Sequence, residues 1–277
     1  MVFVCEGDKN MDNETEIAKE LAKDIYADGG REIVKSTSST INLIPRAIKA
    51  ALSPLEKWIM LKEYNLEVVR RLLEKKLENI SFDKISTPEP YVAVPAVEYL
   101  SYSIDNDTLR EMYANLLAHS MVDVVKNSVH PGFVDIIKQL SPDEAKILKY
   151  MNDDHNVVPT INVRYQNGKG EGLDIVKNFS DIGEKSGCEI PNSTEQVFDN
   201  LSRLGLVDKT ELGALINKDL YKPLKEHKFL DEYRNIQKFK EQGFKLNFTE
   251  SMVQLTAFGR VFCYVCIEDV QKEELSV

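Results

Sequence analysis

The sequence predicts a mainly α-helical protein: an N-terminal helical bundle, then a smaller α+β domain that resembles a winged helix and carries a helical insertion. Apolar residues recur at helical spacing up to about residue 153. Beyond residue 154, β-branched and alternating segments appear. A chain of 277 residues with 43% hydrophobic content can also bury two modest cores. We therefore expect a disordered start at 1–13, a bundle over 14–140 and the winged-helix-like domain over 141–277.

The first predicted helices follow from apolar stripes and from helix-end residues. Apolar side chains recur every four positions from residue 17, and paired glycines at 29 and 30 are typical of a helix end. A short amphipathic helix is expected over 42–52. Ser53 and Pro54 are typical of an N-cap followed by a first-turn proline, which predicts a long helix over 54–79.

The middle of the chain shows the most explicit helix boundaries. Prolines at 88 and 90 interrupt the helical pattern, and a helix over 94–103 follows. Asp105 or Asp107 can cap the next helix, which carries an apolar stripe as far as Val124. Pro131 begins another. The sequence SPDE at 141–144 predicts a capping box with proline in the first turn.

The last third predicts a mixture of helices and strands. The expected elements are, in order, a strand at 157–165, helices at 173–186 and 192–204, a short strand at 206–207, a helical insert at 212–243, a strand at 245–255 and a closing helix at 256–267. Together with the helix at 141–153, this order is typical of a winged helix whose wing contains the insert.

Charge and cysteine content exclude several classes of protein. The net charge is −10 and the pI is about 5.1, which argues against general attraction to nucleic acid or anionic lipid. Four cysteines are too sparse for a disulfide scaffold. The first residues lack the pattern of a signal peptide, and no apolar run approaches the roughly 18 residues of a membrane span. We expect a cytoplasmic protein.

One stretch resembles a known family. The segment DNDTLREMYANLLAHSM at 105–121, followed by VHPGFVDIIKQLSPDEAKIL at 129–148, is similar to the abortive infection alpha (Abi-alpha) family of bacterial proteins. Upstream sequence from residue 52 fits the same family, so the resemblance covers roughly 52–151. It implies a context of phage defence, and it implies no particular activity, catalytic residue or cofactor.

The strongest polar constellation lies within this stretch. Glu111, Asn115 and His119 are spaced four residues apart and therefore line one edge of a helix, and His130 begins the next helix. A carboxylate with two imidazoles could bind a metal or move a proton. Because the spacing matches no known ligand set, we favour a polar contact between helices. We assign no catalytic residue, metal or cofactor, and keep these four as candidates.

The pair Cys263 and Cys266 has the CxxC spacing of zinc and redox sites. Both cysteines fall within the apolar run VFCYVCI, where a free thiol behaves as a small hydrophobic group. We favour a role in the core.

A nucleic-acid site is a further possibility. The insert contains basic residues interleaved with aromatics, which suits single strands; the candidates are Lys222, Lys225, Lys228, Arg234 and Lys238. A solvated amphipathic helix explains them equally well and is favoured. The expected recognition helix has Arg203 as its one cation, so binding of duplex DNA is not expected.

The sequence leaves three functional hypotheses. The first is an abortive-infection protein that binds an unknown protein partner or a phage component. Under this hypothesis the chain could also form homo-oligomers. The second is a toxin-like enzyme that acts on nucleic acid with Glu111, His119 and His130. The third is a membrane-perturbing effector that uses the amphipathic region 42–71, around Trp58; packing of this region within the bundle is favoured.

Overall fold

The structure is a computed structural model that describes residues 43–60, 66–103, 105–153, 156–210, 213–234 and 236–270. The segment expected to be disordered at 1–13 and the helix expected from the apolar stripe that begins at residue 17 lie outside the described residues.

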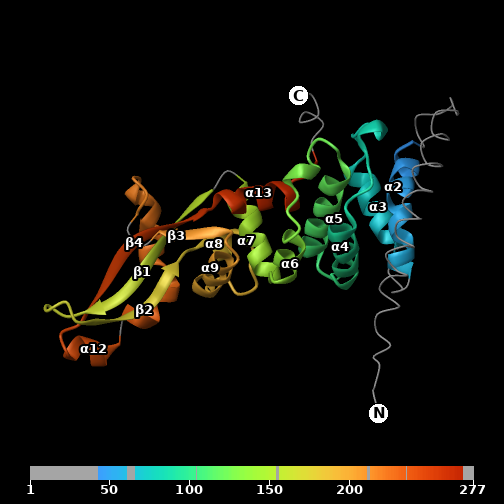
Figure 1. The fold of residues 1–277 in the computed structure, drawn as a ribbon. Coiled ribbons are helices and arrows are strands. Elements are labelled where there is room, and N and C mark those ends of the chain that lie inside the picture. Colours follow the sequence, from blue (N-terminus) through green and yellow to red (C-terminus); the bar gives the residue numbers. More distant parts are fainter. Residues whose placement is uncertain are drawn as a thin grey trace, which may run out of the picture.

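The first part of the described chain is helical. Its helices are α2 (Leu43–Met60), α3 (Leu66–Lys76), α4 (Pro90–Tyr102), α5 (Asp107–Met121), α6 (Phe133–Lys138) and α7 (Pro142–Asn152), with 3-10 turns at Phe82–Lys84 and Lys126–Ser128. Figure 1 shows that these helices gather at one end of an elongated molecule. We call this part the helical end.

Helix boundaries match the sequence where the cap is local. The capping box of α7 is confirmed: the Ser141 N–H donates to Glu144 Oε2 at 2.6 Å, and the Glu144 N–H donates to Ser141 Oγ at 3.2 Å. The cap of α5 was misplaced by one residue, since Asn106 Oδ1 accepts from the Leu109 N–H at 3.0 Å. α2 runs through Ser53 and Pro54, so no helix begins there.

A four-stranded antiparallel sheet forms the other end, which we call the sheet end (Figure 1). Its strands are β1 (Val157–Gln166), β2 (Gly172–Phe179), β3 (Val207–Thr210) and β4 (Lys245–Leu255), in the order β2-β1-β4-β3. The central ladder joins β1 to β4 through ten residue pairs, from Val157 opposite Gln254 to Gln166 opposite Lys245. The strands expected at 157–165 and 245–255 are confirmed.

Short helices connect the strands. They are α8 (Ile182–Lys185), α9 (Thr194–Arg203), the 3-10 turn Lys218–Tyr221, α10 (Lys222–Glu226), the 3-10 turn Lys228–Leu230, α11 (Asp231–Arg234) and α12 (Gln237–Glu241); α13 (Ala257–Cys266) follows β4. The expected insert at 212–243 is thus a series of short turns of helix in its described residues. α13 returns to the helical end (Figure 1).

The predicted fold class was wrong. The chain was expected to be mainly α, with an N-terminal bundle and a winged-helix-like domain. The structure instead combines helices with a four-stranded antiparallel sheet in a mixed α+β fold. The misread segment is 173–186, which was expected to be a helix; its residues 173–179 belong to β2, which pairs with β1. Its spacing of apolar residues suits either structure, and the pairing with β1 decides between them.

Two hydrophobic cores hold the fold together. The main core runs from Ile48 in α2 to Val270 and includes Val158 at the start of β1, so it contains residues from both sides of position 140. The second core lies between the sheet and the insert and consists of Ile161, Val163, Val176, Phe179, Tyr221, Leu224 and Leu230. Because successive side chains of a strand point to opposite faces, β1 contributes one face to each core.

Candidate functional site

The polar edge of α5 lies at the centre of the helical end. Residues Met112 to Met121 of this helix are all buried, including Asn115, His119 and Ser120. Buried polar groups are nearly always hydrogen-bonded within the protein. The partners of these side chains therefore show what the edge does.

Asn115 holds the end of α13. Its side-chain Nδ2 donates to the carbonyl oxygens of Cys266 at 3.3 Å and Ile267 at 2.9 Å. The last carbonyls of a helix have no partner within it, so this amide caps the C-terminus of α13. Both partners only accept, which fixes the amide orientation. The buried Oδ1 then has no hydrogen-bond partner among the described residues, at a cost of about 1–3 kcal/mol.

His119 is fully buried one turn further along α5. Its Nδ1 lies 3.0 Å from the carbonyl oxygen of Asn115. Since a carbonyl only accepts, Nδ1 carries the proton and donates it to this hydrogen bond. The imidazole also packs edge-on against Tyr264 of α13, with the ring centroids 5.1 Å apart. The ring therefore contributes to the contact between α5 and α13.

Glu111 takes part in a three-residue ion pair. The Lys76 ammonium of α3 lies 2.6 Å from the Glu111 carboxylate and 2.7 Å from the carboxylate of Asp269, which follows α13. The Lys76 side chain is only 7% exposed, whereas Glu111 and Asp269 are 44% and 70% exposed. One nearly buried cation thus joins α3, α5 and the segment after α13.

A small pocket of about 180 Å³ lies at this junction, between α5, α7 and the end of α13. Its lining residues are Asp107, Thr108, Glu111, Met112, Asn115, Ala145, Lys149, Cys266 and Ile267. The pocket therefore combines two carboxylates and one ammonium with the carbonyl end of a helix.

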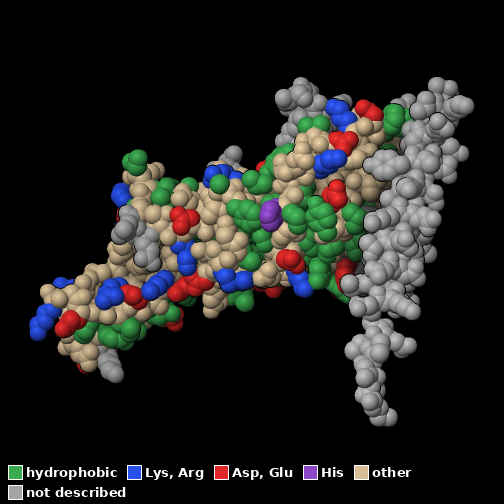
Figure 2. All heavy atoms as spheres, in the orientation of Figure 1, with side chains coloured by type: hydrophobic (Ala, Val, Ile, Leu, Met, Phe, Trp, Pro, Cys, Tyr) green, Lys and Arg blue, Asp and Glu red, His purple; other side chains and the backbone are tan. Residues whose placement is uncertain are grey.

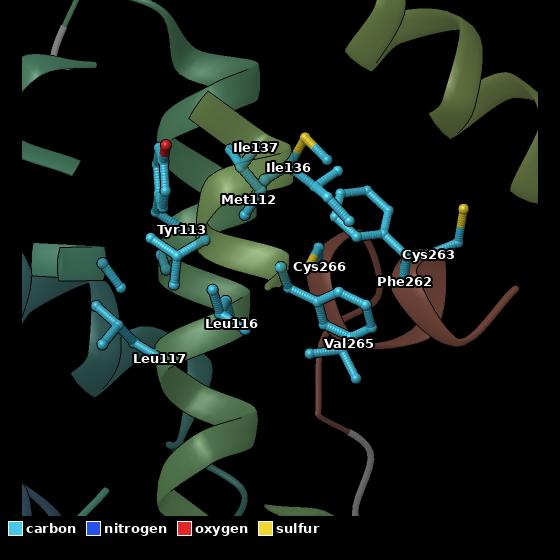
Figure 3. Packing of buried hydrophobic residues seen from close by; sticks show 14 of the residues in the cluster. Met112, Tyr113, Leu116, Leu117, Ile136, Ile137, Phe262, Cys263, Val265 and Cys266 are labelled. Carbon is cyan, nitrogen blue, oxygen red and sulfur yellow. The ribbon is translucent and has the colours of Figure 1, made fainter. Parts of the chain in front are cut away.

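Cys263 and Cys266 lie in the core between α13 and its neighbours. Figure 3 shows Cys266 on the part of α13 that lies toward α5, and Cys263 farther along α13 from α5. Burial raises the pKa of the Cys263 thiol to about 12, and it holds the pKa of Cys266 well above its usual value. Both thiols are therefore neutral at physiological pH. Within the part of the chain that the structure describes, no cluster of three or more His, Cys, Asp or Glu residues could hold a metal ion.

His130 lies at the opposite end of α13 from Asn115. The ring is exposed, its Nδ1 accepts from the Gly132 N–H at 3.1 Å, and it packs against Phe258 with centroids 5.7 Å apart. Phe258 and Cys266 are eight residues apart on α13, which corresponds to roughly 12 Å of helix. His130 therefore does not join Glu111 and Asn115 at one point.

The candidate nucleic-acid residues face carboxylates. The Lys222 ammonium lies 2.7 Å from Asp219, Lys225 lies 2.7 Å from Glu250 and Lys228 lies 3.7 Å from Glu184. Arg234 pairs with Asp231, and the side chain of Lys238 lies outside the described residues. Hydrogen bonds from Lys218 and Lys225 lower the pKa of Glu250. Basic and acidic side chains alternate over the face of the sheet end that Figure 2 shows.

Sequence reasoning missed Lys76 and Asp269. They are 193 positions apart, and each is one of many charged residues in an amphipathic pattern. No local spacing marks such a pair, because only the return of α13 to the helical end brings its members together.

Among the described helices, none has the length and apolarity that crossing a bilayer requires. The model of the abortive infection alpha family matches residues 61–266. A search of curated proteins finds no match.

One solved structure shows a weak likeness. It is that of an uncharacterized protein from the hydrocarbon-degrading marine bacterium Alcanivorax borkumensis SK2. The match covers 49% of this chain and 92% of the other, at 15% sequence identity and a TM-score of 0.34. At that TM-score the likeness supports no argument about fold or function.

Proposed function

Because this chain belongs to the abortive infection alpha family, we propose that it acts in bacterial defence against phage by binding a protein partner rather than by catalysis. The partner is a host protein or a phage component. The proposal includes a cytoplasmic location, where phage components accumulate during infection.

This proposal rests on one observation: the polar side chains along the edge of α5 bind other groups of the protein itself. Asn115 binds two carbonyls of α13, Glu111 binds Lys76, and His119 Nδ1 binds a carbonyl of its own helix. A general acid or base must instead offer its proton-accepting or proton-donating atom to a substrate. The edge therefore supports a role in joining α5 to α13.

The two alternatives have less support. The enzyme hypothesis needs Glu111, His119 and His130 at one point, and His130 contacts the other end of α13. The membrane hypothesis needs an available apolar face on residues 42–71, and Ile48, Ala51 and Leu52 of this region belong to the main core.

The test separates a loss of protection caused by lower stability from one caused by the loss of a catalytic side chain. Bacteria that express the chain are challenged with phage, and protection is measured as plating efficiency for the wild type, Asn115→Ala, His119→Ala and Leu148→Ala. Leu148 is fully buried on α7 and offers no polar group, so Leu148→Ala is the matched control for destabilisation. We expect protection to fall with Tm along one common relation for all three variants.

Two outcomes would contradict the proposal. If the wild type protects no better than an empty vector, the defence role fails. If His119→Ala matches Leu148→Ala in Tm and yet loses all protection, the histidine has a chemical role. In that case purified wild-type protein should degrade RNA or DNA, which the proposal does not expect.

A further inference from the structure

We propose that residues 267–270 form a strap that opens and closes over the small pocket between α5 and α7. The strap follows directly on α13. It goes beyond the proposed function, because neither the family nor a protein partner requires a movable segment at this place.

The strap is held by side chains from three different helices. Asn115 of α5 donates to the Ile267 carbonyl at 2.9 Å, and Asn152 of α7 donates to Glu268 Oε1 at 2.9 Å. Lys76 of α3 donates to Asp269 Oδ1 at 2.7 Å. Ile267 itself lines the pocket of about 180 Å³, opposite Glu111 and Asn115. The strap therefore closes one side of this pocket.

The contacts of the strap differ in kind from those of the helix before it. α13 is anchored in the main core by Phe262, Val265 and Cys266, which are fully buried. The strap is held mainly by polar contacts. Its own carboxylates are accessible, since Glu268 is half-buried and Asp269 is 70% exposed, whereas Lys76 and Asn115 beneath it are nearly buried. Ile267 packs half-buried against the main core, and Val270 is the one fully buried apolar side chain of the strap. Water can replace polar partners at a surface at little cost, whereas it cannot replace core packing. Segments of this kind open well below the free energy of global unfolding.

One atom of the closed arrangement favours opening. Oδ1 of Asn115 is buried without a hydrogen-bond partner among the described residues. When the strap lifts, this oxygen becomes hydrated, and the loss of the bond to Ile267 is partly offset. Opening also uncovers Lys76 and Asn115 beside the half-exposed Glu111, so the strap controls access to the buried part of the polar edge of α5.

The two cysteines of α13 provide a test in the full-length protein. Cys266 lines the pocket beneath the strap, whereas Cys263, one turn earlier on α13, is buried and does not line it (Figure 3). Native protein is treated with N-ethylmaleimide at pH 8, and the modification of each cysteine is followed by tandem mass spectrometry. We expect Cys266 to react faster than Cys263, because local opening reaches the first thiol and only global unfolding reaches the second.

Breaking the ion pair between Lys76 and Asp269 should widen the difference in rate between the two cysteines. Asp269→Ala removes one of the two carboxylate partners of Lys76, the one on the strap, at a largely exposed position. We expect the rate at Cys266 to rise about fivefold while the rate at Cys263 stays constant. The matched control is Asp174→Ala, which removes the ion pair with Arg164 on the distant sheet and should change neither rate.

Equal rates at the two cysteines, in both the wild type and Asp269→Ala, would show that only global unfolding exposes them and would overturn the strap. The strap would also be overturned if Asp174→Ala raised the reaction rate of Cys266 as much as Asp269→Ala does. A variant that only loses global stability is recognised because the modification rate of Cys263 also rises.

Discussion

Single residues in this protein show how far a local signal reaches. Glu144 is buried, and its carboxylate accepts from the Ser141 N–H at 2.6 Å and from Asn200 Nδ2 at 2.8 Å. The first contact was predictable, because the capping box spans three residues. The second joins residues 56 positions apart and has no local signature. The same holds for Asn115 and Glu111: their spacing can be read in the sequence, but their partners, which are distant in the sequence, cannot.

The Cys263 thiol predicts a loss of stability at alkaline pH. Its pKa in the folded protein is raised to about 12 by burial, above the usual value of 9.0. The neutral thiol favours the folded state, so this contribution is complete below pH 9 and is lost as the pH rises toward 12. We expect Cys263→Ala to reduce the slope of unfolding free energy against pH by up to about 1.4 kcal/mol per unit.

The measurement is urea unfolding at several pH values between 8 and 11. Cys188→Ala is the comparison: burial raises the pKa of this thiol too, but the side chain is only partly buried, so we expect a smaller change of slope. Identical slopes for Cys263→Ala and the wild type would contradict the assignment.

At the scale of elements, the boundaries that sequence predicted well are those with their own local pattern. α7 begins at a capping box, and the alternating pattern at 245–255 coincides with β4. The failures are elements whose state depends on a distant partner. Residues 172–179 form a strand because β1 lies beside them, and α2 continues through Ser53 and Pro54 within a longer helix.

The contact of α13 with Leu206, in the turn between α9 and β3, depends on a glycine. A Cβ at Gly259 would lie 2.0 Å from the carbonyl oxygen of Leu206, which also accepts from the Thr256 N–H at 3.0 Å. We expect Gly259→Ala to force the first turn of α13 away from Leu206 and to lower the free energy of unfolding by about 2 kcal/mol or more.

Gly168→Ala is the matched control, because a Cβ at this turn position meets nothing within 4 Å. Its effect should stay within about 0.5 kcal/mol. Both values come from chemical denaturation. Equal stability of the two variants would mean that α13 is not seated as closely as the structure shows.

For the whole molecule, the main core is the decisive feature. It contains residues from α2, from the start of β1 and from the segment after α13, so it crosses the domain boundary predicted at 140. The strands β1 and β4 also connect this core to the second one, beneath the insert. Such an arrangement couples the helical end to the sheet end.

We therefore expect the chain to unfold in one cooperative transition. Leu148→Ala in the main core and Leu224→Ala in the second core should each move that single transition to lower temperature, at a cost of about 2–5 kcal/mol. Differential scanning calorimetry checks this. Two separate transitions, with Leu224→Ala moving only one of them, would support the predicted division into 14–140 and 141–277 instead.

The sequence by itself determined the resemblance to the abortive infection alpha family, the capped helix at 142, the two central strands and the polar edge of α5. These features depend on residues within a few positions of one another, so a single stretch of chain specifies them. Only the tertiary structure decided that β1 pairs with β4, that residues 172–179 are a strand, and that Asn115 and Lys76 hold the chain beyond α13. The physical reason is that strand pairing and ion pairing depend on groups far apart in the sequence, whose approach is set by the packing of the whole molecule.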